Sequence, residues 1–144
     1  MAALTIAEIR GRVATACAAL GGWTQSRAAP GRFGADTDQL LPQCFAVEIS
    51  DTVLHPAPGR QTPTLGASAD SVVAVAWAYR LKGDAPTTSL DAGTTAEAVL
   101  VAGVLGVSQA DLHLTYTDAS RDTETEGWLI GRVRFRALHR LSLS

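Results

Sequence analysis

The stretch WLIGRVRFRALHR, residues 128–140, shows the clearest alternation in the chain. Side chains alternate across a β-strand, so every second residue faces the same side of a sheet. One side of this stretch is apolar and consists of Leu129, Gly131, Val133, Phe135 and Ala137. The other side consists of Trp128, Ile130, Arg132, Arg134, Arg136, Leu138 and Arg140. The pattern predicts a strand with one buried face and a row of arginines on the other.

The row of arginines requires an environment that offsets its charge, because like charges two residues apart on one strand face repel each other. Three interpretations are open. The row faces solvent on an outer sheet face, contacts carboxylates of another subunit or partner, or lines a pore that meets DNA phosphate. Trp128 and Ile130 share this face, which argues against full solvation of its first half.

Length and composition favour one globular domain over residues 1–144. Hydrophobic residues make up 47% and charged residues 18%, a balance that favours buried contacts between subunits. The net charge of −2 predicts no general affinity for nucleic acid. No stretch reaches the ~20 apolar residues of a membrane span, and the first residues lack the pattern of a signal peptide. We therefore expect a soluble cytoplasmic product, with Cys17 and Cys44 reduced in its core.

Two capping boxes predict two helices. Thr5 with Glu8 precedes apolar residues at helical spacing and indicates a helix over about 5–20. Thr94 with Glu97 indicates a second helix that runs to about Leu105. Its apolar residues occupy nearly the whole circumference, so we expect burial all round, with part of the cover supplied by another subunit.

Strands are expected over 43–54, 71–81, 111–117 and 128–140, in the order α-β-β-α-β-β. Neighbouring strands should form antiparallel hairpins. The predicted fold class is α+β, with a mainly antiparallel four-stranded sheet and two helices. Long loops rich in glycine and proline are expected near 23–42 and 55–69.

The strand over 71–81 is apolar on both faces, which predicts cover on both sides. Its small residues are Val72, Ala74, Ala76 and Ala78, and its large ones are Val73, Val75, Trp77, Tyr79 and Leu81. A helix should approach closely against the alanines. The larger face would then remain apolar and available for association, which makes Trp77 and Tyr79 candidate subunit contacts.

Acidic residues gather with Arg121 in an expected hairpin tip over 118–127, at Asp118, Asp122, Glu124 and Glu126. A solvated turn, a contact with a basic partner and a divalent ion are the open interpretations. One hypothesis pairs Asp122, Glu124 and Glu126 with the arginine row of a neighbouring subunit. Head-to-tail contacts of that kind generate rings.

Motifs of catalysis are missing from the sequence. It contains no glycine-rich phosphate loop and no nucleophile elbow. His55, His113 and His139 have no second histidine or cysteine at metal-ligand spacing, and we expect partly exposed structural residues. We therefore expect no enzyme activity, no metal and no cofactor.

The chain resembles the tail terminator, or tail completion, proteins of long-tailed bacteriophages and phage-derived particles. An amphipathic helix ends in Gly21-Gly22-Trp23, and an irregular loop leads to the strand Cys44-Phe45-Ala46-Val47-Glu48-Ile49. A long strand ends in Ala78-Tyr79-Arg80-Leu81, and an apolar helix opens at Thr94-Thr95-Ala96-Glu97. A polar tip and residues 127–136, GWLIGRVRFR, close the pattern. The resemblance covers nearly the whole chain in order and length.

This resemblance implies a structural virion protein that forms a hexameric ring. Such a ring caps the tail tube, ends tail growth and joins the tail to the head. It implies a tail tube protein and a head–tail connector or neck protein as partners, with DNA passing through the lumen. The expected location is the neck end of the virion tail, after assembly in the host cytoplasm. Alternatives are another head–tail neck protein and a small-ligand-binding α+β module.

The candidate subunit and partner contacts come from the residue patterns alone. They are Arg132, Arg134, Arg136, Arg140, Asp122, Glu124, Glu126, Trp77 and Tyr79.

Overall fold

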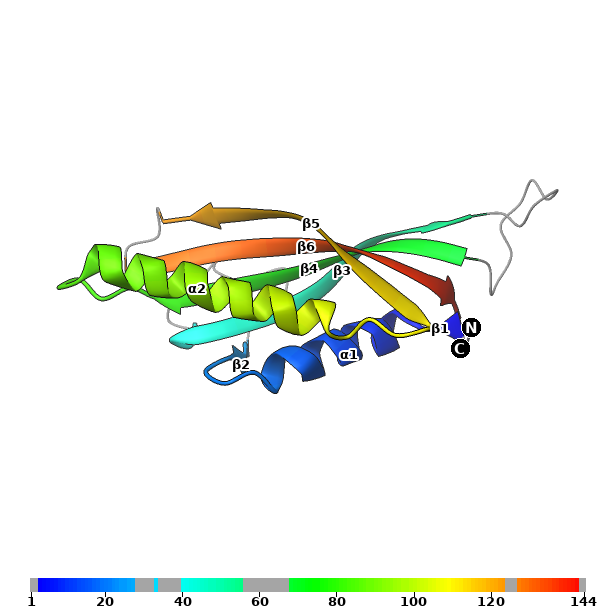
Figure 1. The fold of residues 1–144 in the computed structure, drawn as a ribbon, viewed down its shortest axis with the longest axis horizontal. Helices are drawn as coiled ribbons and strands as arrows, with labels where there is room; N and C mark the ends of the chain where they lie inside the picture. Colours follow the sequence, from blue (N-terminus) through cyan, green and yellow to red (C-terminus); the bar gives the residue numbers. More distant parts are fainter. Residues whose placement is uncertain (1–2, 28–32, 34–39, 56–67, 124–126, 143–144) are drawn as a thin grey trace.

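The computed structural model describes residues 3–27, 33, 40–55, 68–123 and 127–142. Two helices lie against one face of a six-stranded sheet (Figure 1). The elements follow in the order β1 (Ala3–Leu4), α1 (Ile6–Ala18), β2 (Thr24–Gln25), β3 (Gln43–Leu54), β4 (Ser68–Arg80), α2 (Pro86–Leu105), β5 (Leu112–Asp122) and β6 (Trp128–Leu141).

The predicted four-stranded, mainly antiparallel sheet is wrong, because the sheet is mixed and has six strands. β1 pairs with the end of β6 and β2 with the start of β3, both in parallel. Each of these two strands has two residues. A two-residue segment is too short to show the alternation from which a strand is recognised in sequence.

β6 is central to the arrangement. It pairs with β4 on one side and with β5 and β1 on the other, while β3 lies beyond β4. β3 with β4 and β5 with β6 are antiparallel neighbours, as expected. The pairing between β4 and β6 is also antiparallel and joins these two hairpins into one sheet.

The first helix follows its sequence signals. Thr5 is its N-cap, and the predicted capping box with Glu8 is present. Ile9, Val13 and Cys17 recur at helical spacing and are fully buried against the sheet.

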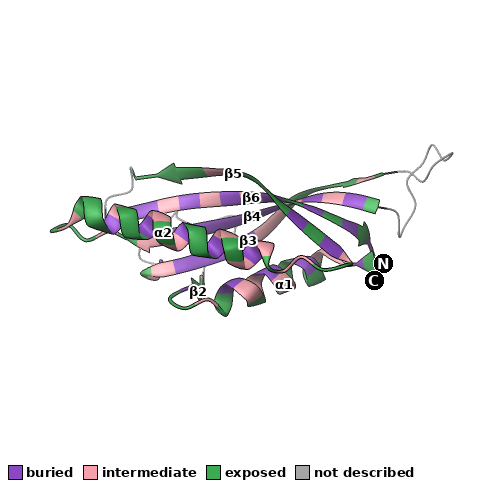
Figure 2. Cartoon of the chain, in the orientation of Figure 1, coloured by how far each residue is buried: buried purple, intermediate pink, exposed green. Residues whose placement is uncertain are grey.

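The second helix begins earlier than predicted and is less buried than predicted. It begins at Pro86 rather than near Thr94, whose hydroxyl donates to the Asp91 carbonyl within the helix. Proline suits the first turn because its missing N–H has no helical partner there. The expected burial all round is also wrong, since Val99 is 45% exposed. Figure 2 shows exposed positions along the outer side of this helix.

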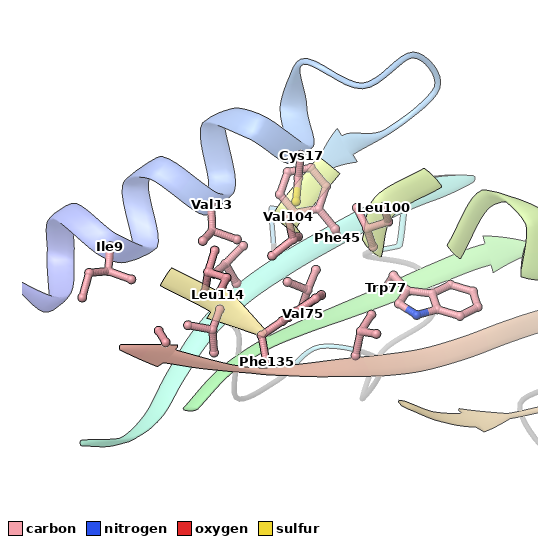
Figure 3. Packing of buried hydrophobic residues seen from close by; sticks show 14 of the residues in the cluster. Ile9, Val13, Cys17, Phe45, Val75, Trp77, Leu100, Val104, Leu114 and Phe135 are labelled. Atoms are coloured by element: carbon pink, nitrogen blue, oxygen red, sulfur yellow. The ribbon is translucent and has the colours of Figure 1, made fainter. Parts of the chain in front are cut away.

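The two faces of β4 are covered in the opposite way to that expected. Val73, Val75 and Trp77, the large residues, lie under the helices and are 0% exposed (Figure 3). The small alanines face the side without helices. Large side chains remove more apolar area from water, so the helices gain more by covering them. Trp77 is therefore a core residue, and the predicted exposed apolar patch is wrong.

Gly131 on β6 makes room for the Trp77 indole. A Cβ added at Gly131 would overlap the six-membered ring and the ring nitrogen of Trp77. The two residues are direct cross-strand partners, so neither can move away without disturbing the pairing of β4 with β6.

Gly131→Ala should lower the free energy of unfolding by about 1–3 kcal/mol, the usual cost of overpacking a core. Urea denaturation measures the change. Gly83→Ala is the matched control, because a Cβ at Gly83 meets no atom within 4 Å. Equal stability of the two variants would show that Gly131 does not limit the packing of Trp77.

Candidate functional site: the arginine face

The arginine face is the side of the sheet that the helices leave uncovered, centred on Arg132, Arg134 and Arg136 of β6. The predicted alternation of β6 is confirmed, because Leu129, Gly131, Val133, Phe135 and Ala137 are all buried. The direct partners of the three arginines on β4 are Ala76, Ala74 and Val72. These small side chains leave space over β4 for the long guanidinium groups.

Carboxylates of three neighbouring strands pair with the row. Arg136 donates two hydrogen bonds of 2.8 and 2.7 Å to Asp70 on β4. Arg134 lies 3.0 Å from Asp118 on β5. Arg132 reaches across β4 to Glu48 on β3, at 3.4 Å. The repulsion within the row is therefore offset inside one chain.

Asp70 accepts hydrogen bonds from Arg136 and also lies within hydrogen-bond distance of His55. His55 Nε2 lies 2.6 Å from the carboxylate oxygen that Arg136 also contacts. The hydrogen bonds from Arg136, with a smaller contribution from His55, lower the pKa of Asp70 below its ordinary value of 3.8. The same contact raises the pKa of Arg136. Arg136 is largely exposed, so this pair orders the face more than it stabilises the fold.

Asp70→Asn should therefore destabilise the protein slightly near neutral pH, and its effect should shrink as the pH falls below 3.8. A carboxyl with a lowered folded pKa stabilises above its unfolded pKa, near 3.8, and loses that effect as pH falls through the folded pKa. Thermal unfolding at pH 7 and pH 2.5 measures this. A Tm difference from the unaltered protein that is unchanged at both pH values would contradict the assignment.

The first half of the face is apolar, as Trp128 and Ile130 indicated. Trp128 is 4% exposed and belongs to a second core cluster. The cluster consists of Leu40, Cys44, Ala78 and Trp128, with Phe33, Leu41 and Ile130 packed against it. The Arg80 guanidinium lies 5.3 Å from the centre of the Trp128 ring, a cation–π contact.

The acidic residues are placed differently from the expected hairpin tip. β5 continues to Asp122, so Asp118, Arg121 and Asp122 lie on a strand. Arg121 binds the buried carboxylate of Glu97 on α2, with one hydrogen bond of 2.9 Å. This contact raises the pKa of Arg121. The alternation of β5 is interrupted by an extra residue between Tyr116 and Asp118, which concealed its second half.

The remaining candidate contacts are separated from this site. Tyr79 is half-buried and packs against the main core cluster. Arg140 is exposed at the far end of β6 and has no ion pair among the described residues. Glu124 and Glu126 lie outside the described residues. The contact of the acidic segment with a neighbour's arginines stays a prediction, but three of those arginines already have partners in their own chain.

A polar chain lies at one end of the core, with Ser71 and His139 buried and Thr52 exposed. Thr52 Oγ1 is 2.8 Å from Ser71 Oγ, and Ser71 Oγ is 2.7 Å from His139 Nε2. His139 Nδ1 lies 3.1 Å from the Arg140 carbonyl oxygen, to which it donates. His139 is 2% exposed, so its predicted partial exposure is wrong. A serine nucleophile needs access to substrate, which Ser71 lacks at 1% exposure.

Ser71→Ala should cost about 1–3 kcal/mol of unfolding free energy, because it leaves a buried imidazole nitrogen without its partner. Ser120→Ala on the exposed part of β5 is the control and should change stability by less than about 0.5 kcal/mol. Chemical denaturation of both variants measures the difference. A Ser71→Ala variant as stable as the control would show that the polar chain does not support the fold.

The chain has two free, buried cysteines. Burial raises the pKa of Cys17 to about 12, and burial also raises the pKa of Cys44. Neither thiol is therefore an activated nucleophile at neutral pH. In the described part of the chain, no group of three or more histidine, cysteine, aspartate or glutamate residues is arranged to hold a metal ion.

A groove lies between α1 and β3. Its volume is about 550 Å³. The residues along it are mostly small: Ala7, Arg10, Gly11, Ala14, Thr15, Ala18, Gln25, Ser26, Ala46 and Val47. A second, smaller hollow of about 210 Å³ adjoins Arg132 on the arginine face.

Comparison with known proteins gives no assignment: no model of a protein family matches the chain, and no protein of curated function matches it either. Neither helix of the described structure combines the length and the apolar character required to cross a membrane.

Proposed function

We propose that this chain is a structural subunit that closes with copies of itself into a ring at the end of a phage-type tail. The observation that supports an assembly role is the open sheet. Its two outermost long strands, β3 and β5, have 12 and 11 residues. Long strands with unpaired backbone groups at a sheet edge are templates for pairing with another chain.

The chemistry of the described residues supports the same class. The one serine–histidine contact is buried, both thiols have raised pKa values, and most of the arginine row is paired internally. The serine, the histidine and the thiols belong to the core, and the paired arginines order the sheet face that the helices leave uncovered.

The specific role rests on the sequence resemblance to tail terminators. In this proposal the ring caps the tail tube, ends its growth and joins the tail to the head. Its partners are the tail tube protein and a head–tail connector, and DNA passes through the lumen. Another protein of the head–tail neck would share the ring but not the binding to tube ends.

A small-ligand-binding module is the second candidate, and one observation favours it. The groove of about 550 Å³ between α1 and β3 lies within the size range of ligand pockets, ~300–1,000 Å³. Arg10, Thr15 and Ser26 provide polar groups along it. A module of this kind would bind its ligand as a monomer.

Sedimentation velocity across a range of concentrations tests the proposal. We expect a concentration-dependent transition from a monomer of 15.0 kDa to a ring of about six subunits. Electron microscopy with purified tail tubes should show rings at tube ends. A chain that is monomeric at every concentration and ignores tube ends contradicts the proposal.

A further inference from the structure

The outer strands β3 and β5 each have a free edge among the described residues. β2 covers only Cys44 and Phe45 of β3, and the remainder of that edge as far as Leu54 has no paired strand in the described structure. β5 pairs laterally with β6 alone, apart from a bridge between Gln109 and Leu112 at its start. Figure 1 shows β5 at one border of the sheet and β3 toward the opposite one, with α1 extending from β1 to β2.

Hydrogen bonds at these edges show which backbone groups point outward. The Phe45 carbonyl accepts from Ser26 N–H on the outer side of β3, so Val47 and Ile49 also point their N–H and C=O outward. On β5, Leu114 N–H bonds Ser108 Oγ on the outer side, so Tyr116 points outward as well.

The same orientation resumes beyond the extra residue of β5. Tyr116 and Ala119 pair with Phe135 and Val133, which are two residues apart on β6. Two residues of that spacing point their backbone groups the same way. Ala119 therefore points its N–H and C=O outward, like Tyr116.

The register of the sheet aligns these groups. Ile49, Val73, Phe135 and Tyr116 form one row of cross-strand partners, and Val47, Val75, Val133 and Ala119 form the next row on the same face. β3 and β5 run in opposite directions, because three antiparallel pairings separate them.

Consequently, a second copy that is rotated beside the first, with no shift along the strands, brings its β5 as far as Ala119 antiparallel to the part of β3 that β2 leaves free. Arg121 and Asp122 of that copy are level with Phe45 and Cys44, where β2 covers the edge, so the end of β5 turns away from β3 there. Tyr116 then lies opposite Ile49, and Ala119 lies opposite Val47. All four residues point their backbone groups toward the new partner, so both rows become hydrogen-bonded pairs, with the extra residue of β5 between them.

The groove beside β3 and the Tyr116 side chain lie on the same face of the sheet. Tyr116 faces the helix side of the sheet but is 47% exposed, since it lies on the outermost strand. The groove on that side is lined by Ala7, Gly11 and Ala14 of α1 and by Val47. Arg10, which has no ion pair among the described residues, provides a cation near an incoming aromatic ring.

We infer that the groove between α1 and β3 receives β5 of a second copy of this chain, with Tyr116 of that copy as the inserted side chain. The inference rests on the proposed ring and specifies its subunit contact. Tyr116 on one edge of the sheet enters the groove at the other edge, so the contact is head-to-tail. Repetition of this contact closes a ring if the rotation between neighbouring copies permits.

Charge does not drive this contact. In the same register, Glu48 of one copy is level with Asp118 of the next on the arginine face. Each carboxylate is already paired with an arginine of its own chain. Assembly should therefore persist at high salt, unlike a ring formed by acidic residues and an unpaired arginine row.

A disulfide between Glu48→Cys and Asp118→Cys tests the register. These positions are a non-hydrogen-bonded pair across the proposed contact, the geometry in which side chains approach most closely. Within one chain, three strand spacings of ~4.8 Å separate them, so no intramolecular bond can form. The double variant should give covalent ladders of up to about six subunits on mild oxidation. The native Cys17 and Cys44 are buried and should not compete.

The matched control combines Glu48→Cys with His113→Cys. His113 is exposed on the same strand, but it is level with Val53 and lies about 14 Å along the strand from the Glu48 row. The control should give no ladder. Equal ladders from both double variants would contradict the register.

Two substitutions test the fit of the Tyr116 side chain in the groove. Gly11→Leu should fill the groove without damage to the fold, because a Cβ there meets no atom within 4 Å. Tyr116→Ala removes the inserted ring. Each should raise the concentration at half assembly by about tenfold or more in sedimentation velocity. Two controls alter exposed positions of α2: Ala102→Leu adds a leucine side chain and Val99→Ala shortens a side chain to alanine. Both should leave the concentration at half assembly unchanged.

The outcomes separate this inference from the proposed function. If rings form but neither the ladder nor the effects of Gly11→Leu and Tyr116→Ala appear, the subunit contact lies elsewhere and the ring proposal stands. If the unaltered chain never assembles, both are overturned. If Gly11→Leu abolishes binding of a small molecule by a monomer, the groove is a ligand pocket instead.

Discussion

The pairing of β4 with β6 is the constraint on which the structure depends. It extends from the pair Ser68–Arg140 to the pair Arg80–Trp128 and joins two hairpins that are separate in the chain. Its helix side contains Val73, Val75 and Trp77 with their β6 partners, the centre of the main core. Gly131 permits this pairing by leaving space for the Trp77 ring.

The same pairing determines the character of the opposite face. Small residues on β4 lie beside the arginines of β6, and the carboxylates that balance them come from β3, β4 and β5. A row of like charges becomes an ordered, nearly neutral surface within one chain. The backbone edges of β3 and β5 then remain without a paired strand over most of their described length, which points to pairing between copies.

Strong local signals in the sequence were sufficient for several elements. The strand over 43–54 and the cap of α1 were predicted correctly, because alternation and a capping box are local patterns. The start of α2 was placed at Thr94 instead of Pro86 because Thr94 and Glu97 imitate a capping box, while Glu97 in fact pairs with Arg121 on β5; its end at Leu105 was predicted correctly. The second half of β5 was missed because an extra residue interrupts its alternation.

The arginine face was predicted as a row, but its partners were not. Glu48, Asp70 and Asp118 belong to three different strands, and only the lateral order of those strands brings them to the arginines. That order depends on long-range packing, which no local pattern encodes. For the same reason, the helices were assigned to the wrong face of β4, and Trp77 was expected at a surface.

Amide hydrogen exchange at low and high protein concentration tests the central claim most directly, namely that free strand edges pair between copies. The account predicts that the amides of Val47, Ile49, Tyr116 and Ala119 exchange rapidly in dilute solution and become protected on assembly, while the central amides of β4 and β6 are protected throughout. Rapid exchange at those four positions in the assembled protein would contradict it.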